Sequence, residues 1–188
     1  ERYPPERFIP TNSERDLLLR ILKPRPGLYT RLSEMHGRGL LGRLFPEFKK
    51  VYCHVIRDYY HKYTVDEHTL LTIRNIEHLC TPRTRSRTRF ANLFTEIAKP
   101  ELLILALLFH DVGKWTNKNH SEEGARMAVG ALRRIKLPEK DIATVEFLIR
   151  HHLQMSVAAF RRDVEDPGTV TQFANLVGTE ERLKLLCL

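Results

Sequence analysis

Residues of the types that bind divalent metal ions recur in several separate segments of this 188-residue chain. His110 and Asp111 are adjacent, and they directly follow an apolar run over residues 102–109. Adjacent ionisable groups at the end of a buried segment are costly unless something pairs with them. A divalent cation would remove this cost, because neutral imidazoles donate lone pairs and the carboxylate supplies charge. The pair therefore predicts a metal site.

Further histidines could share that site, and they come from three other segments: His68, His120, His151 and His152. A single histidine is more often a hydrogen-bonded ring than a ligand, but the set as a whole favours a common site. His152 falls on the same helical stripe as Val145 and Leu148, so we expect it to face inward. We expect the candidates to converge between helices, with His120 at the margin. The remaining histidines, His36, His54, His61 and His78, are interpreted as ordinary hydrogen-bonded rings.

The elements that position these residues are predicted to be helices, and the fold class to be all-α. No sustained alternation of period two and no Asn-Gly or Asp-Gly turn indicates a strand. The expected helices are 14–22 with Asn12 or Ser13 as cap, 26–37, a short one after Pro46, 64–79, 101–109, 121–135, 138–153, 167–177 capped by Asp166, and a last one capped by Thr179. Thr64 and Glu67 have the spacing of a capping box, which places His68 near the start of its helix.

One predicted helix stands apart, because residues 102–109 are apolar on every side. Such a helix belongs in the middle of a core, so we expect it to be the most buried helix and to be contacted by the helices that begin near Thr64 and Pro138. A buried strand is the competing interpretation for eight apolar residues. Ile104 is the one β-branched residue in the run and leucine dominates, which favours a helix. Gly113 is the expected C-terminal stop.

Composition sets the class of protein. A mass of 22.0 kDa with 42% apolar and 29% charged residues is typical of one globular domain, which excludes a disordered or collagen-like chain. Three cysteines without a CxxC pair argue against a disulfide framework and a cysteine-rich zinc site, so we expect a cytoplasmic protein. The longest apolar run is well short of the roughly 20 residues that span a bilayer. Both ends look cut, which indicates a piece of a longer chain.

The charge balance favours acidic partners, because 31 Lys and Arg against 23 Asp and Glu give a net charge of +8. Part of the excess lies in an arginine-rich segment formed by Arg83, Arg85, Arg87 and Arg89. A solvated basic loop is the favoured interpretation. Contact with RNA or DNA is the alternative, but it would call for interleaved aromatic residues, and only Phe90 is near.

The order His68, His110-Asp111, His120, His151-His152 resembles the pattern of the HD-domain phosphohydrolase superfamily. The stretches 44–48, 60–70, 106–114 and 155–167 are similar to the central HD domain of the bacterial bifunctional uridylyltransferase/uridylyl-removing enzymes, which modify the PII nitrogen-signalling protein. The resemblance implies an HD domain over 40–188, truncated at its C-terminal end, after an N-terminal helical segment or linker over 1–39. Two departures stand out. Residues 115–119 replace a glycine-rich loop, and the late metal-binding Asp of the family would fall beyond Leu188.

The resemblance also implies a reaction, the metal-dependent removal of UMP from a tyrosine of PII. The cofactor would be a divalent metal, Mg or Mn first and Fe or Zn as alternatives. One ion would be held by His68, His110 and Asp111, and a second would be bridged through Asp111 to His120, His151 and His152. Asp111 and Lys114 would be catalytic, and Lys114, Arg161 and Arg162 would bind substrate. A solvated Lys114, and ion pairs of the arginines with Asp163 or Glu165, are the alternatives.

The implied partners are uridylylated PII and the nucleotidyltransferase and regulatory domains of the parent chain, with no nucleic acid and no membrane. Two other functions stay open. One is an HD hydrolase of a free nucleotide, and the other is a non-catalytic HD module that binds a nucleotide or a partner protein. Substrate assays distinguish hydrolysis of a free nucleotide from uridylyl removal. Metal analysis distinguishes these two metal-dependent enzymes from the non-catalytic module.

Overall fold

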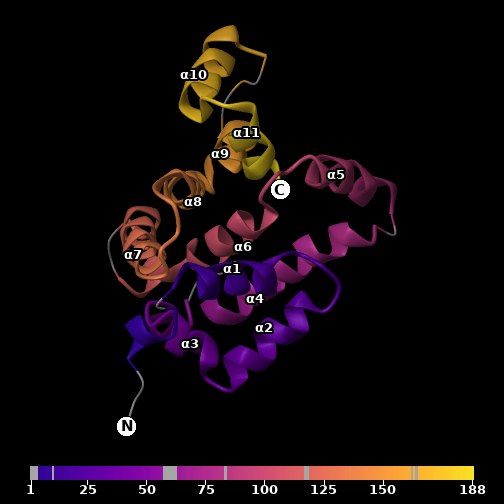
Figure 1. Cartoon of the computed structure of the whole chain (residues 1–188). Coiled ribbons are helices and arrows are strands. Elements are labelled where there is room, and N and C mark those ends of the chain that lie inside the picture. The colour runs from indigo at the N-terminus through magenta and orange to yellow at the C-terminus, as the bar shows by residue number, and fades with distance from the viewer. Residues whose placement is uncertain are drawn as a thin grey trace.

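A computed structural model describes residues 4–9, 11–56, 63–82, 84–116, 119–161, 163 and 165–188, with the side chains of Ser86 and Arg161 outside the description. The described residues are helical and contain no strand, which confirms the all-α prediction (Figure 1). The α-helices are α1 (Asn12–Leu22), α2 (Leu28–Gly37), α3 (Leu40–Leu44), α4 (Val65–Glu77), α5 (Arg85–Thr95), α6 (Pro100–Phe109), α7 (His120–Arg134), α8 (Glu139–His151), α9 (Gln154–Arg161), α10 (Pro167–Val177) and α11 (Glu180–Cys187). Short 3-10 helices are η1 (Pro5–Arg7), η2 (Phe48–Val51), η3 (His78–Cys80) and η4 (Val112–Trp115).

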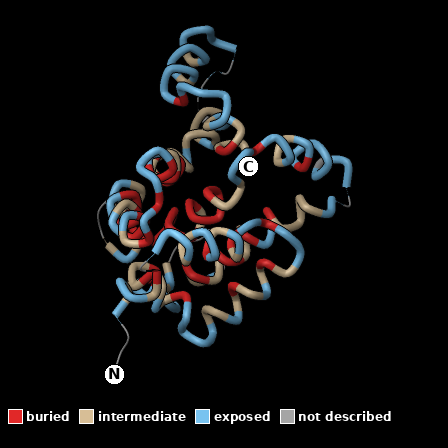
Figure 2. The backbone as a smooth tube through the Cα atoms, in the orientation of Figure 1, coloured by how far each residue is buried: buried red, intermediate tan, exposed pale blue. Residues whose placement is uncertain are grey.

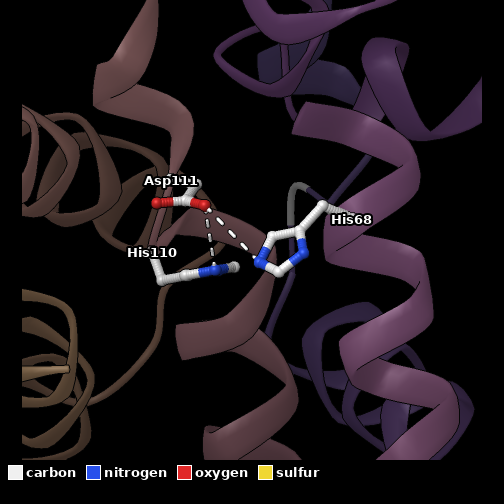
Figure 3. A group of neighbouring side chains, drawn as sticks. All are labelled: His68, His110 and Asp111. Atoms are coloured by element: carbon white, nitrogen blue, oxygen red, sulfur yellow. Dashed lines mark ion pairs between the residues drawn. The ribbon is translucent and has the colours of Figure 1, made fainter. Parts of the chain in front are cut away.

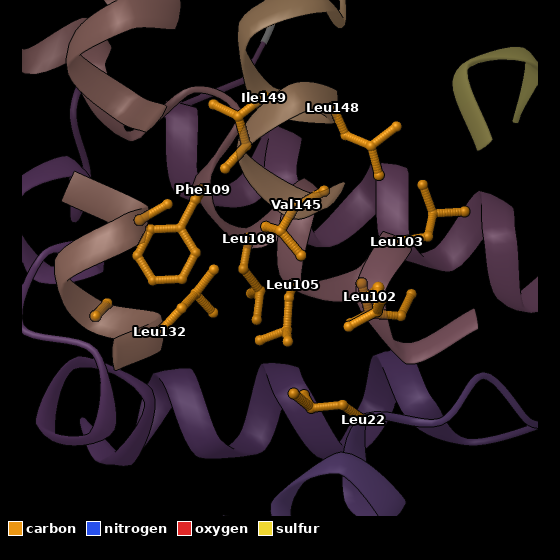
Figure 4. Close-up of a cluster of buried hydrophobic side chains, with 14 of the residues drawn as sticks. Leu22, Leu102, Leu103, Leu105, Leu108, Phe109, Leu132, Val145, Leu148 and Ile149 are labelled. Carbon is orange, nitrogen blue, oxygen red and sulfur yellow. The ribbon is translucent and has the colours of Figure 1, made fainter. Parts of the chain in front are cut away.

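Helix α6 lies against four other helices, namely α1, α4, α7 and α8. It is apolar on every side, and its residues from Leu102 to Phe109 are buried apart from Leu107. Figure 4 shows leucines of α6 between Leu22 below and Val145 and Leu148 above. Buried positions gather at this centre, and α5 and α10 are largely exposed (Figure 2). The contacts with α4 and α8 are those expected from the sequence.

The N-terminal helices share this core. Leu18 and Leu22 of α1 and Leu28 and Leu32 of α2 are buried, and they belong to the same apolar cluster as α6. Helix α1 packs on α6 and α2 packs on α4. The apolar faces of α1 and α2 are therefore covered within this chain. None of the described helices is long and apolar enough to cross a membrane.

The structure corrects two of the expected helix caps and confirms two others. The N-cap of α1 is Thr11, one residue earlier than expected, and it forms a capping box with Glu14. Thr64 is the N-cap of α4, but its hydroxyl bonds the Asp66 carboxylate and makes no cap bond, so the predicted capping box with Glu67 was wrong. The caps predicted at Asp166 and Thr179 are confirmed.

The arginine-rich segment is the largest correction to the expected elements. It was interpreted as a loop, but Arg85, Arg87 and Arg89 lie in α5, whereas Arg83 lies outside the described residues. The Thr84 hydroxyl accepts a hydrogen bond from the Arg87 N–H and caps the helix. Arginine is a good helix former, and the apolar residues of this helix, such as Phe90, Ala91 and Phe94, begin only after its arginines, so the arginine-rich part shows no apolar period of its own. Arg85, Arg87 and Arg89 are exposed, as the favoured interpretation of a solvated basic segment required.

Candidate metal centre

The candidate ligands meet at Asp111, which follows the end of α6 and is almost fully buried. Its Oδ2 lies 3.2 Å from His110 Nε2 and 3.8 Å from His68 Nε2. Figure 3 shows His68 reaching across from α4 toward the His110-Asp111 pair. Metal-ligand bonds of about 2.1 Å place two ligands of one ion roughly 3 to 4 Å apart, so this spacing suits a bound cation.

A second set of ligand atoms faces the other oxygen of Asp111. His120 Nε2 and His152 Nε2 each lie 4.0 Å from Asp111 Oδ1. Within each set of three residues, one ligand atom per residue lies within 4.8 Å of the others. Asp111 is common to both sets, so its two carboxylate oxygens are placed to face two ions. Paired metal sites with a shared carboxylate are typical of enzymes that displace a group at phosphorus.

His110 and His152 are oriented by the same kind of hydrogen bond, from the ring to a backbone carbonyl of the preceding helix turn. Each is the C-cap of its helix, α6 or α8, where the last carbonyl groups lack helical partners. His110 Nδ1 donates to the Leu107 carbonyl at 2.6 Å, and His152 Nδ1 donates to the Ile149 carbonyl at 2.7 Å. These bonds fix the ring orientations, so Nε2 of each ring faces Asp111 and would offer its lone pair to a cation bound there. A ligand histidine held by a carbonyl in this way is typical of metal sites.

His120 is positioned by close contact between two backbones. It is the first residue of α7, and η4 packs against that end of the helix. A Cβ atom at Gly113 would lie 2.0 Å from the His120 carbonyl oxygen, so only glycine lets the segments approach this closely. Gly113 was expected to stop a helix, and instead it allows this contact. The Arg150 side chain of α8 pairs with Glu122 of α7 and Glu146 of its own helix, which joins the segments that carry His120 and His152.

The electrostatics of the site suit metal ligation. Burial opposes ionisation of Asp111, but His110 and Lys114 outweigh it and hold the pKa of the carboxyl well below its usual range. Burial lowers the pKa of His152 to about 4 and also lowers the pKa of His120. Both rings are therefore neutral near pH 7, as a metal ligand must be. His120 Nε2 is buried and has no hydrogen-bond partner among the described residues, so the donor set fits a cation.

Lys114 lies at the site, with its Nζ 2.8 Å from Asp111 Oδ2 and its side chain largely buried. The alternative of a solvated lysine is therefore wrong. His151 is separated from the other candidates, contrary to expectation, because adjacent residues of a helix point about 100° apart. Its ring lies 4.7 Å from the ring of Phe147, and it belongs to neither ligand set among the described residues. The proposed roles of Arg161 and Arg162 fall on side chains outside the description.

The sequence interpretation missed a second polar cluster beside this site. His36 was interpreted as an ordinary hydrogen-bonded ring, and it is one, but its partner was not foreseen: its Nε2 lies 2.9 Å from Oδ2 of the buried Asp66. The Cys53 N–H also donates to Asp66. Burial opposes ionisation of Asp66, and the bonds from Cys53, Thr64 and His36 outweigh it and lower its pKa. No local pattern joins residues 36 and 66, so the pair could not be found from the sequence.

Comparison with known proteins agrees with this geometry. The family model described as "HD domain" matches residues 65–186. Proteins named "Bifunctional uridylyltransferase/uridylyl-removing enzyme" are similar over most of the chain, including those of Nitrosococcus oceani (38% identical over 97% of this chain) and Ectopseudomonas mendocina (38% over 90%). A third, from Xanthomonas euvesicatoria, is 42% identical over 84% of this chain.

This chain spans about a fifth of the length of these relatives, with 21%, 19% and 18% of each covered. No solved structure matches it. The match to the family model covers His68, the His110-Asp111 pair, His120 and His152, which are the residues that the fold brings together. The chain belongs to the HD domain family.

Proposed function

We propose that this domain is a metal-dependent phosphodiesterase that removes UMP from a tyrosine of uridylylated PII. The observation that carries the proposal is the convergence of four histidine Nε2 atoms on the two oxygens of one buried carboxylate, Asp111. Its support in the comparisons is the similarity to proteins whose name includes uridylyl removal. The PII tyrosine ester as substrate follows from the resemblance of the sequence motifs.

The residues that would hold metal are His68, His110 and Asp111 on one side and His120 and His152 on the other. Bound divalent metal supplies a water of lowered pKa and charge for the phosphoryl oxygens. His110 and His152 keep their Nε2 atoms aimed at the site through their bonds to backbone carbonyls. His68 is the most exposed of the ligands, with 40% of its side chain accessible, so substrate would enter on its side.

Lys114 would supply the remaining positive charge. Its ammonium group lies 2.8 Å from Asp111 Oδ2, so it is placed to neutralise charge on a non-bridging phosphate oxygen when substrate binds at the site. The leaving group is a tyrosine phenolate whose conjugate acid has a pKa of about 10, so it departs without strong help from a general acid. Charge neutralisation by Lys114 is therefore the main contribution of the chain beyond its metal ligands.

The test is release of UMP from uridylylated PII by the wild type and by Asp111→Asn. Asp16→Asn, which removes an exposed carboxylate on α1, is the matched control. Both are made in this chain and in a form extended past Leu188, because the resemblance implies a further acidic ligand there. We expect EDTA to abolish release and Mn²⁺ or Mg²⁺ to restore it. Asp111→Asn should lower the rate by at least about a hundredfold, while Asp16→Asn should leave it unchanged.

Circular dichroism provides the folding control, since loss of a ligand should leave the helices in place. Equal rates for the extended wild type and its Asp111→Asn variant would overturn the proposal. Hydrolysis of free nucleotides with no release from PII would favour the HD nucleotide hydrolase instead. Metal-independent binding without hydrolysis of either substrate would favour the non-catalytic module.

A further inference from the structure

A second concave site lies outside the metal centre, between the N-terminal segment and the turn that joins α2 to α3. It is a cavity of about 950 Å³. Its lining comes from η1, the end of α2, α3 and η2, and none of the candidate metal ligands belongs to it. Figure 1 shows the N-terminal segment beside α3. A volume in this range is typical of sites for small organic ligands.

Glycines keep this cavity open. Gly37 and Gly39 flank the turn between α2 and α3, and a Cβ atom at either would meet no atom within 4 Å. Gly39 has φ of +71°, a left-handed conformation that favours glycine and turns the chain away from α2. Gly42 faces the same space from α3. The wall on this side is therefore bare backbone, which a ligand can approach closely.

The charge of the lining is entirely positive. Arg38, Arg43 and Lys49 all line the cavity and are exposed, and no acidic residue is among its described lining. Within the part of the chain that the structure describes, none of the three has an ion-pair partner. Three unpaired cations around one concave surface favour an anionic ligand, and arginine is well suited to phosphate.

Aromatic rings complete the lining. Tyr52 is 57% exposed at the cavity, and its ring lies 5.1 Å from that of His36. Phe48 contacts the same histidine edge-on, with the ring centres 5.5 Å apart. The hydrogen bond between His36 Nε2 and the buried Asp66 carboxylate fixes the position of the His36 ring. The exposed face of Tyr52 is therefore a fixed platform on which a planar ring can stack.

A ligand that satisfies both features carries phosphate groups and a flat ring. We propose that this cavity is a binding site for a free nucleoside phosphate, separate from the metal centre. Arg38, Arg43 and Lys49 would hold the phosphates, and the base would stack on Tyr52. The proposal goes beyond the proposed hydrolase function and does not depend on it, because the site shares no residue with the metal ligands.

The test is equilibrium binding of UTP to this chain, measured by calorimetry in EDTA so that no divalent metal contributes. The double variant Arg38→Ser/Arg43→Ser should bind at least about tenfold more weakly, as expected from loss of charge-assisted contacts. Arg20→Ser/Arg25→Ser removes the same charge from exposed positions of the chain outside the cavity and should bind like the wild type. Tyr52→Leu should also weaken binding, and ribose 5-phosphate should bind more weakly than UTP.

A second variant tests the cavity independently, in case Arg38→Ser/Arg43→Ser does not fold. Gly37→Glu places an acid in the cavity, and its Cβ would meet no atom, so the fold should persist by circular dichroism while UTP binding is lost. Equal weakening by the cavity and control double variants would show general charge attraction and overturn the proposal. Absence of UTP binding by the folded wild type would also overturn it. A third result would overturn it as well. If ribose 5-phosphate bound as tightly as UTP and Tyr52→Leu had no effect on UTP binding, the base would not contact the Tyr52 ring.

Discussion

At the scale of single residues, the site depends on which side of its helix each histidine occupies. His151 and His152 are adjacent, yet only His152 faces Asp111, and His151 packs on Phe147. The stripe containing Val145 and Leu148 predicted the inward position of His152, and the same stripe excludes His151. The sequence interpretation nevertheless kept both as candidate ligands, although the stripe marks only His152 as inward-facing. His120, which was expected at the margin, belongs to a ligand set.

This difference makes the two histidines a matched pair for mutation. His120→Ala removes a buried Nε2 that has no hydrogen-bond partner in the described residues, so Mn²⁺ affinity should fall by about tenfold or more. His151→Ala removes a ring outside both ligand sets and should change Mn²⁺ affinity by less than about twofold. Calorimetric titration with Mn²⁺ checks both. If His151→Ala weakens Mn²⁺ binding as much as His120→Ala, the assignment of ligands by helix face is wrong.

At the scale of elements, the site is held by the ends of helices. His68 lies in the first turns of α4, His120 begins α7, and His110 and His152 end α6 and α8. Helix ends offer unpaired backbone groups, and the carbonyl bonds of His110 and His152 use them. The sequence predicted α4, α7 and α8 from their apolar stripes, and α6 from an apolar surface on every side. It did not predict α5, because the arginine-rich first half of that helix has no apolar residue, or α3, which has only five residues.

The contact between η4 and α7 gives a test at this scale. Gly113→Ala would bring a Cβ against the His120 carbonyl, so the two segments must separate. We expect a loss of roughly 2 kcal/mol or more in the free energy of unfolding, together with weaker Mn²⁺ binding. Gly130→Ala is the control on α7, because its Cβ meets nothing and it is exposed. It should stabilise the helix by up to about 1 kcal/mol. Urea unfolding in EDTA measures both, and equal stability of the two variants would contradict the proposed close approach.

At the scale of the whole molecule, the helices that form the hydrophobic core also carry the candidate metal ligands. Helix α6 is surrounded by α1, α4, α7 and α8, and three of these carry candidate ligands to its end. The sequence predicted this arrangement for two reasons. A helix that is apolar on every side must be buried by other helices, and the ionisable groups of His110 and Asp111 at its end need a partner. The cavity beside α3 and the His36–Asp66 pair could not be predicted. They depend on contacts between segments that are far apart in the sequence, and the residue spacing within a single helix does not indicate such contacts.

Burial of the site also has a consequence for the stability of the whole fold. The pKa of His152 falls to about 4 because burial disfavours its charged form, whereas an unfolded histidine has a pKa of about 6.5. Between these values the unfolded chain binds more protons than the folded one. Stability from His152 is therefore fully present above the unfolded pKa and is lost as the pH falls toward 4. The carboxyls of Asp66 and Asp111 have pKa values below their usual range, so their titration lies below this window.

We therefore expect the free energy of unfolding to fall by about 2 kcal/mol through His152 alone when the pH is lowered from 7 to 5. Urea unfolding in EDTA at the two pH values measures this fall. His152→Gln should remove that part of the pH dependence, while His54→Gln, which changes a histidine outside both ligand sets, should keep it. Burial also lowers the pKa values of His120 and His151, so some dependence on pH should remain in His152→Gln. If His152→Gln and the wild type lose the same stability between pH 7 and 5, then the ring of His152 is not held neutral in the folded chain. Its place as a ligand aimed at Asp111 would then be in question, because a protonated Nε2 has no lone pair to donate to a metal ion.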